Sequence, residues 1–587
     1  MCIPMSAKKI VTRVEIDYDF CNLTWGSSPC TAAFGGGSIR KCYNTFSTCP
    51  VQAVYDKGTK TLKFIEASYS VKSGNHIPAL IKVGGYEQEV NIAGFSNEIG
   101  ALGQRASVSV TLRDFPSRDT ITDKYFAGRM DGTAQTNEGP YDPIDRGSFW
   151  TKFKARVPNY AGRALRVIQA HFDDAGALVD DVTRHYVIDE IIGPDKSGNV
   201  TIKAKDILAL VDDAKAVAPK TNKGRLLEAI TAVQTNATLS PSGIGDLNYA
   251  ATGVITIGSE IMYFDRTGDT LFLYRGQFGT SAAAHSANDT VQEAFSVYKD
   301  RADYVIYSLL TNYGNIPTGY INFPEWQAEF DRWGASMYLS TTICKPSGVS
   351  KLIGEINQLG ITIWWDEINQ KIRVKLNHPP DETPVEWSDR NNIMSITTED
   401  NDNERATRVE MWTVQIDPTK ELNKENFLRG YITIGIAEES PDLFGIQRTQ
   451  TIYNRWLNHG ADSTTKIITN RLLNRYKRAP VTYTVKIDNK DNPSLADVIS
   501  LNSYVHTDTT GLITPKLTQV YYRADDRNGS TVTAKLQSYQ FDARYGRIAE
   551  NTRPVYNSST AEQKLKGSYF VGPSLLFSDG SGPYQFA

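Results

Sequence analysis

The sequence places four of its six cysteines within 29 residues, at Cys21, Cys30, Cys42 and Cys49. Eight, eleven and six residues separate them, and the segment is rich in glycine. A segment of this kind can fold back so that four sulfur atoms converge on one metal centre. Because such a centre ties down a stretch too short to bury its own core, it strongly constrains the fold of this region.

The spacing of the cysteines bears on which group they would hold. Zinc ribbons usually place their ligands in pairs two to four residues apart, and the sequence has no such pair. Wide and unequal gaps favour a larger group, a [4Fe-4S] cluster, with zinc as the alternative. Two disulfides are a third possibility, but residues 1–10 lack the apolar run of a secretory signal, so we expect synthesis in a reducing cytoplasm. Cys344 has apolar neighbours and is predicted to be a buried thiol.

Length and charge exclude several classes of protein. A chain of 587 residues is long enough for three to five domains. Its 63 basic and 66 acidic residues give a net charge of −3, so no overall basic excess indicates nucleic-acid binding. No run of about eighteen apolar residues occurs, and a transmembrane helix is therefore not expected.

Alternating apolar and polar residues predict a mainly β protein. Between residues 55 and 215, apolar Val108, Val110 and Leu112 alternate with polar neighbours. Further strands are predicted over 165–168, 185–188 and 199–202, followed by a short helix over 205–210. A second β-rich region is predicted from strands over 481–487, 520–522 and 531–536, after a helix over 464–478.

The middle of the chain has a different pattern. Short strands are predicted around 253–258 and 260–264, after a loop over 237–243. Apolar residues at helical spacing predict a helix that includes Leu352 and ends near Gly360. Segments 361–367 and 371–376 then predict a β-hairpin.

Candidate catalytic groups are few, and we predict no catalytic residues and no enzyme. The sequence contains no nucleophile elbow, His-Glu-x-x-His, phosphate-binding loop or dinucleotide fingerprint. His285 has no carboxylate or cysteine nearby at ligand spacing, so we expect it to fix a loop by hydrogen bonding. Asp366 and Glu367 are adjacent at a strand end and are predicted to be solvated turn charges. Phe149 and Trp150 are expected to pack in a core.

The cysteine segment resembles the iron–sulfur motif of tail-tip proteins from long-tailed, non-contractile bacteriophages and of hub proteins from gene transfer agents. The matching residues are Cys21–Gly26, Pro29-Cys30, Lys41–Thr45 and Thr48-Cys49. The outer gaps of eight and six residues also agree with the family's pattern. A second set of segments resembles the first domain of phage tail-hub proteins: 102–110, 114–116, 147–152, 163–167 and 187–189.

This resemblance implies a fold and a set of partners. The four cysteines Cys21, Cys30, Cys42 and Cys49 would hold a [4Fe-4S] cluster. The chain would be the baseplate hub at a virion tail tip, a homotrimer that closes the tail tube and opens for genome ejection. Its partners would be the distal tail protein ring, the C-terminus of the tape-measure protein, and tail fibres or a central fibre protein. DNA would pass through it, and contact with the host cell surface would be indirect.

The implied domain order combines two tail-tube-like β-barrels with a small inserted β-module and an α+β bridging region. The expected bounds are 1–55 for a cysteine-rich iron–sulfur segment, 56–220 for the first barrel, 221–298 for the module, 299–392 for the bridging domain, 393–550 for the second barrel and 551–587 for a C-terminal docking tail. Two alternatives come from other classes of protein. One is an iron–sulfur electron-transfer protein, although no flavin or nucleotide fingerprint accompanies the cysteines. The other is a carbohydrate-binding adhesin, suggested by the small β-module and by 30 tyrosines and 9 tryptophans.

Overall fold

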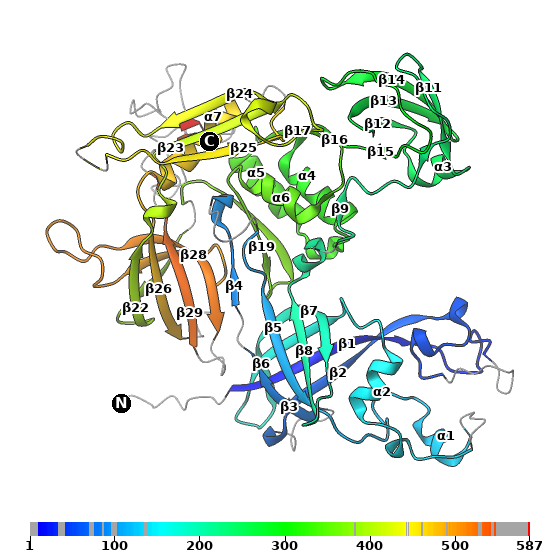
Figure 1. Ribbon diagram of the computed structural model, residues 1–587. Coiled ribbons are helices and arrows are strands. Elements are labelled where there is room, and N and C mark those ends of the chain that lie inside the picture. The colour runs from blue at the N-terminus through cyan, green and yellow to red at the C-terminus, as the bar shows by residue number, and fades with distance from the viewer. Residues whose placement is uncertain are drawn as a thin grey trace, which may run out of the picture.

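The fold is mainly β and multidomain (Figure 1). The computed structural model describes residues 10–32, 42–69, 76–84, 87–95, 102–133, 139–212, 214–380, 383–441, 443, 445–458, 462–488, 491, 493–525, 531–539, 541, 545–546 and 585–586. The expected docking tail lies outside these residues except for 585–586. No helix in the described ranges is long and apolar enough to span a membrane.

Seven strands close the first barrel. In their order around it they are β1 (Ile10–Cys21), β2 (Lys57–Glu66), β3 (Ile77–Val83), β5 (Ser107–Arg113), β8 (Asn199–Lys205), β7 (Leu178–Ile192) and β6 (Ala164–Phe172). Pairing of β5 with β8 and of β6 with β1 closes the ring, and only β2 and β3 run parallel. Val108, Val110 and Leu112 point into the core as predicted. Helix α2 (Phe149–Arg156) adds Trp150, whose ring stacks on Phe64 with centroids 5.6 Å apart, and this confirms the core role of Trp150.

The first barrel begins earlier in the chain than the expected boundary at residue 56. Strand β1 pairs with β2 on one side and β6 on the other, so it is an integral barrel strand. Its last residue is Cys21. The alternating pattern of β1 buries Val14, Ile16 and Tyr18 in the core of the first barrel. The cysteine segment therefore continues directly from a strand of the barrel wall.

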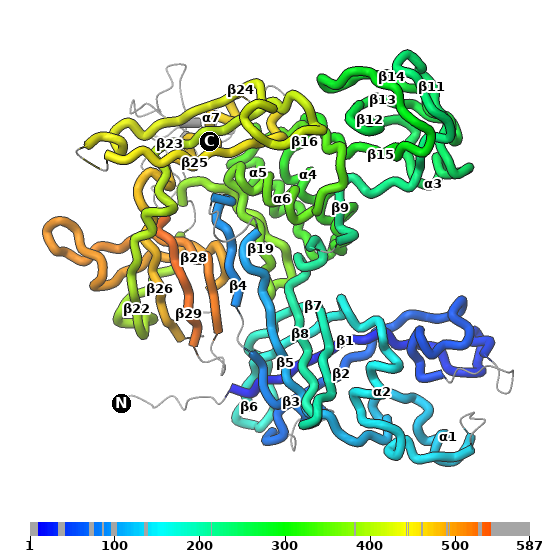
Figure 2. Tube along the Cα trace, viewed as in Figure 1, coloured from blue at the N-terminus to red at the C-terminus, as the bar shows by residue number. Residues whose placement is uncertain are grey.

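A second, nearly closed barrel follows near the end of the chain. Its strands, in order, are β22 (Ile393–Asp400), β26 (Val481–Asp488), β29 (Thr531–Ser538), β28 (Lys516–Asp525), β27 (Val498–Asn502) and β21 (Val385–Ser388). It includes β21, which precedes the expected start at residue 393. Strand β4 (Glu87–Glu89) pairs with both β28 and β5, so the two barrels form one 14-stranded sheet (Figure 2).

The inserted module is a six-stranded sheet with its own core, at the upper right of Figure 1. Its elements are β10 (Arg225–Leu226), β11 (Asn236–Ser240), α3 (Ile244–Asn248), β12 (Thr252–Ile257), β13 (Glu260–Thr267), β14 (Thr270–Gln277) and β15 (Val291–Glu293). The sheet order is β10-β11-β14-β13-β12-β15. The sheet completely buries Leu226, Ile255 and Met262. These residues belong to a hydrophobic cluster distinct from those of the barrels.

The bridging region joins the module to the second barrel. Its elements are β16 (Phe295–Arg301), α4 (Ala302–Ser308), a π-helix (Leu309–Tyr313), α5 (Phe323–Trp333), β17 (Tyr338–Ile343), β18 (Ser347–Gly348), which pairs with β9 (Val217–Ala218), α6 (Val349–Asn357), β19 (Ile361–Asp366) and β20 (Lys371–Leu376). A three-stranded sheet of β24 (Phe427–Ile434), β23 (Arg408–Gln415) and β25 (Thr449–Tyr453) packs against α7 (Asp462–Tyr476). The predicted helices at 352 and 464–478 and the predicted hairpin are confirmed. One hydrophobic core runs from α6 through α7 into the second barrel, so these parts are not packed as separate units.

The turn between β19 and β20 corrects one expectation. Asp366 and Glu367 are buried, not solvated. Glu367 accepts a hydrogen bond at 2.8 Å from Nε of Arg184, which lies on β7 of the first barrel. The hairpin turn packs against that strand, and this contact could not be seen from the local sequence because 183 residues separate the two side chains.

Candidate metal centre

The four clustered cysteines line one pocket next to the first barrel. Cys21 ends β1, and its backbone N–H donates to the carbonyl of Asn44 at 2.7 Å. Cys30 follows a turn in which its N–H donates to the carbonyl of Ser27 at 2.8 Å. Cys42 and Cys49 flank a 3-10 helix (Phe46–Thr48). The end of a strand, a turn and the two sides of a helix therefore each position part of the set of four thiols around the pocket.

Asn44 connects three parts of this pocket. It has a φ of 57°, a left-handed conformation that asparagine tolerates better than most residues. Its buried Nδ2 donates to the carbonyl of Leu23 at 3.2 Å and to that of Cys21 at 3.4 Å. Its backbone N–H points to Sγ of Cys42 at 3.4 Å. In the sequence Asn44 is only one residue of the resembling motif, and no local signal identifies this role.

Burial and repulsion from neighbouring thiolates disfavour ionisation of Cys42 and Cys49. Burial raises the pKa of Cys42 to about 11, and the neighbouring Cys49, Cys21 and Cys30 act in the same direction, against the hydrogen bond from Asn44. The pKa of Cys49 is raised by burial and by Cys21 and Cys30. The four thiols thus lie within one another's electrostatic field. A bound cation would reverse this preference, because it stabilises the thiolate form.

The donor set fits a group that binds through thiolates. The pocket lining contains four thiols and no carboxylate or imidazole. No three His, Cys, Asp or Glu side chains in the described ranges lie close enough together to hold a single metal ion. None of the five described cysteines forms a disulfide. The pocket encloses about 20 Å³, so a four-iron cluster would have to push the cysteine-bearing segments apart.

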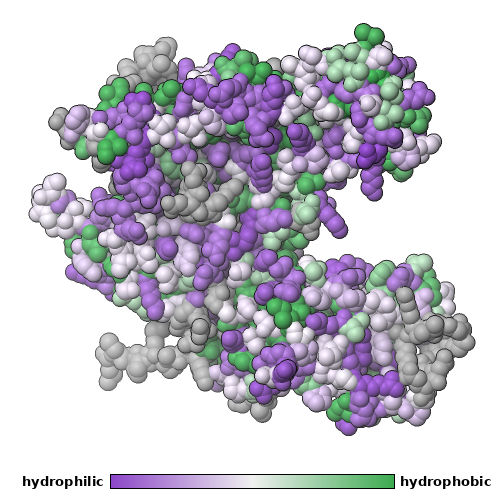
Figure 3. All heavy atoms as spheres, viewed as in Figure 1, coloured by the Kyte–Doolittle hydropathy of each residue, from purple (hydrophilic) through white to green (hydrophobic). Residues whose placement is uncertain are grey.

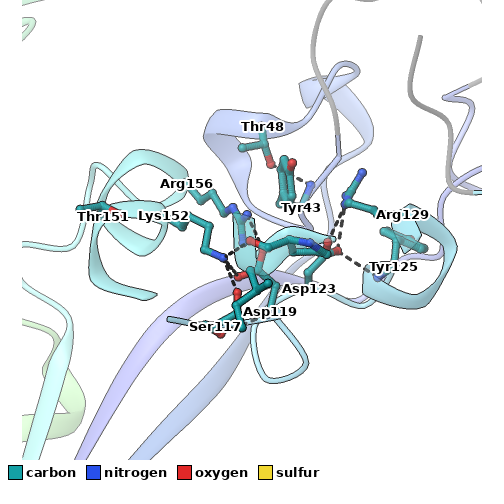
Figure 4. A network of polar contacts seen from close by, with 12 residues as sticks. Tyr43, Thr48, Ser117, Asp119, Asp123, Tyr125, Arg129, Thr151, Lys152 and Arg156 are labelled. Carbon is teal, nitrogen blue, oxygen red and sulfur yellow. Dashed lines mark hydrogen bonds and ion pairs between the residues drawn. The ribbon is translucent and has the colours of Figure 1, made fainter. Parts of the chain in front are cut away.

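A network of charged residues surrounds Tyr43, the residue that follows Cys42 in the chain (Figure 4). Arg129 of α1 (Phe126–Asp131) is buried; its Nε donates to Oδ2 of Asp123 at 2.6 Å, and its Nη2 donates to the carbonyl of Cys42 at 2.6 Å. Its guanidinium lies 4.1 Å from the centroid of the Tyr43 ring. Arg156 of α2 lies 3.9 Å from the same centroid.

Each of these two arginines is neutralised by a buried aspartate. Asp123 serves Arg129, while Asp119 accepts from Nη2 of Arg156 at 2.7 Å and pairs with Lys152 at 2.8 Å. Tyr43 is therefore held between two guanidinium groups by cation–π contact. The network anchors the residue next to Cys42 to two helices more than 80 residues further along the chain.

The other sequence candidates have structural roles. His285 Nε2 lies 2.9 Å from Oε2 of Glu260, so it does have a carboxylate partner, 25 residues away. Although burial opposes it, hydrogen bonds from Arg275, the Ala283 N–H and His285 hold the pKa of Glu260 down at about 2. This network ties the loop around His285 to β13, which agrees with the predicted loop-fixing role. Cys344 is buried as predicted.

Comparison with known proteins gives only distant likenesses. No family model and no curated protein matches this chain. Solved structures with a detectable likeness include a tail protein from Neisseria meningitidis MC58, 10% identical, covering 78% of this chain and 96% of that one with a TM-score of 0.36. A 43 kDa tail protein of prophage MuSo2 from Shewanella oneidensis is 9% identical, covering 78% and 98% with a TM-score of 0.35. Prophage tail protein gp18 from Listeria monocytogenes EGD-e is 9% identical, covering 64% and 86% with a TM-score of 0.29.

Proposed function

We propose that this chain is the structural hub of a bacteriophage tail tip. The observation that carries the proposal is that Cys21, Cys30, Cys42 and Cys49, the cysteines of the resembling motif, line one pocket. The pocket continues directly from a closed seven-stranded barrel, and β4 connects this barrel to a second one. A subunit with two barrels is the architecture that the resemblance implies.

In this proposal three copies place six barrels around one axis. The ring would join the distal tail protein ring to tail fibres or a central fibre protein, and would receive the C-terminus of the tape-measure protein until DNA passes. A strongly basic passage would retain DNA through its phosphates. The net charge of −3 is compatible with passage of a polyanion.

We further propose that the four cysteines hold a [4Fe-4S] cluster with a structural role. Four thiolate ligands would leave no iron free for substrate chemistry. When bound, the cluster supplies a crosslink between the end of β1, the turn before Cys30 and the segment 42–49. These stretches bury few side chains of their own, so the crosslink would replace a hydrophobic core.

Metal analysis tests the cofactor. After anaerobic purification we expect about four iron and four sulfide per chain, with broad absorption in the visible. Cys42→Ser should abolish iron binding, whereas Cys344→Ser, which changes a buried cysteine outside the pocket, should retain it. One zinc without sulfide would refute the iron cluster and leave the crosslinking role in place.

Imaging of assembled particles tests the hub separately. Cryo-electron microscopy should place three copies at the distal end of the tail tube. A stable monomer in the particle, or a location away from the tip, would refute the hub whatever the metal content.

A second candidate function is carbohydrate binding by the inserted module. Tyr263, Phe272 and Tyr274 are exposed on adjacent strands β13 and β14, with Tyr263 directly opposite Tyr274. Figure 3 shows hydrophobic residues among polar ones over this module. Aromatic rings on a rigid sheet can stack on sugar rings. A glycan array with the full chain and with Tyr274→Ala tests this; uniformly flat binding by the unaltered chain would refute it.

A further inference from the structure

A polar pocket lies where β4, the strand that connects the two barrels, meets the outer face of the second barrel. It encloses about 300 Å³, at the lower end of the volumes of small-ligand sites. Residues of the segments 89–92 and 399–404 line it, together with residues of strands β26 and β29. The segment 399–404 comprises the end of β22 and the residues that follow it. The pocket shares no residue with the cysteine pocket.

The charges around this pocket are unbalanced. Three carboxylates line it, those of Glu89, Glu399 and Glu404, against the one ammonium group of Lys535, which leaves a surplus of two negative charges. Burial raises the pKa of Glu89, and the charge of Lys535 opposes that shift. Within the described ranges the Glu89 side chain makes no hydrogen bond. A partly buried carboxylate without a donor favours the entry of a cation.

Gln537 provides an independent sign of a missing ligand. Its side chain lines the pocket and is only 7% exposed. Its Nε2 donates to Oε2 of Glu404 at 2.7 Å, which fixes the orientation of the amide. Its Oε1 is buried and has no hydrogen-bond partner within the described part of the chain. Buried acceptors are nearly always paired, so this oxygen is an unmet hydrogen-bond acceptor in a residue of the pocket wall.

We infer that this pocket binds a guanidinium group, as the arginine side chain of a neighbouring protein carries. A guanidinium has five N–H donors and no acceptor, which matches a wall of carboxylate and amide oxygens. It is also more weakly hydrated than an ammonium group, so it enters a half-buried site at lower cost. Glu89 and Glu399 would supply the opposite charge, and Gln537 Oε1 would accept one hydrogen bond.

This inference does not depend on the proposed hub function. It concerns the seam between the two barrels, since Glu89 belongs to β4 and Gln537 to β29. A guanidinium held by both residues would add a contact across that seam. The neighbouring chain would therefore stabilise one relative arrangement of the barrels when it binds.

Titration calorimetry on the full chain tests the inference. The probes are the capped peptide acetyl-Gly-Arg-Gly-amide and its citrulline analogue, which has nearly the same shape but no charge. We expect the citrulline peptide to bind at least about tenfold more weakly, because it lacks the charge-assisted hydrogen bonds. Free agmatine distinguishes the source of the group: binding of agmatine without binding of the arginine peptide would overturn the assignment to a protein side chain.

Variants make the test specific to the pocket. Glu89→Gln and Gln537→Met should each weaken the arginine peptide several-fold, whereas Lys535→Met should strengthen it because a competing cation is removed. The matched control is Glu190→Gln, which changes an exposed carboxylate on β7 and should leave affinity unchanged. Thermal unfolding verifies that each variant folds. Equal affinity for arginine and citrulline peptides, or equal losses in Glu89→Gln and Glu190→Gln, would overturn the inference.

Discussion

Replacing Arg184 by methionine should loosen the joint between the two barrels and the bridging region. Arg184 lies on β7 and is 1% exposed. Its Nε donates to Glu367 Oε1 at 2.8 Å in the β19–β20 turn, and its Nη2 lies 2.7 Å from Asp525 Oδ2 at the end of β28. One guanidinium thus pairs with carboxylates from two other parts of the fold.

The size of the effect follows from what the substitution leaves behind. Removing one partner of a buried ion pair typically costs about 3–5 kcal/mol, since the remaining charge has neither partner nor water. Asp525 would keep Arg523, whose Nε lies 3.0 Å from its Oδ1, and Glu367 would keep the Tyr186 hydroxyl at 3.1 Å. We therefore expect the lower end of that range, about 3 kcal/mol.

Hydrogen exchange measures this loss at the joint itself. The free energy of local opening should fall for the amides of β28 and of the β19–β20 hairpin in Arg184→Met. The matched control is Lys203→Met on β8, which breaks an ion pair whose side chains are 52% and 53% exposed. Exposed pairs contribute at most about 1 kcal/mol.

Neutralising the Glu367 carboxylate should restore part of the stability that Arg184→Met loses. Arg184→Met combined with Glu367→Gln leaves a neutral side chain in place of the unpaired carboxylate, so the double variant should be more stable than Arg184→Met alone. If Arg184→Met costs no more than Lys203→Met, the reasoning about the buried charges is wrong.

Three further predictions test other parts of the structure. Burial, and then the charge of Arg166, lowers the pKa of His185 from about 6.5 to about 4. The neutral imidazole therefore contributes to stability above about pH 6.5, and this contribution is lost as the pH falls toward 4. Melting temperatures of the native chain and of His185→Gln should converge with falling pH, and parallel pH profiles would contradict this. Gly103 has a φ of +74°, and a Cβ there would meet the Glu89 carbonyl oxygen at 2.2 Å, whereas a Cβ at Gly162, with a φ of +76°, would meet nothing within 4 Å. In urea unfolding, the free energy of unfolding should fall by about 1–2 kcal/mol for Gly162→Ala, from backbone strain alone, and by more for Gly103→Ala. Equal losses in the two variants would exclude the clash. Arg129→Lys should lower iron content and increase protease cleavage near residue 43, because lysine cannot reproduce the paired contacts to Asp123 and to the Cys42 carbonyl. The control is Arg225→Lys, which changes an exposed arginine of the inserted module. Identical behaviour of the two variants would argue against the network.

Much of the secondary structure can be predicted because local periodicity encodes it. Alternation at residues 108–112 and 481–487 predicts strands whose apolar side chains the structure buries. Helical spacing around Leu352 and Leu472 predicts α6 and α7 for the same reason. The spacing of the four cysteines also marks them as one candidate site, and the structure places all four around one pocket.

The sequence by itself determined which faces of the strands and helices are apolar and which residue types gather in the segment 21–49. Only the tertiary structure decided that β1 completes the first barrel, that Asn44 joins three parts of the cysteine pocket, and that Glu367 is buried against Arg184. The physical reason is that periodicity reports whether a side chain is buried, while its partner is set by chain segments up to hundreds of residues away. Buried charges show this most clearly, because a carboxylate such as Glu367 resembles a surface residue until the guanidinium that pairs with it is in place.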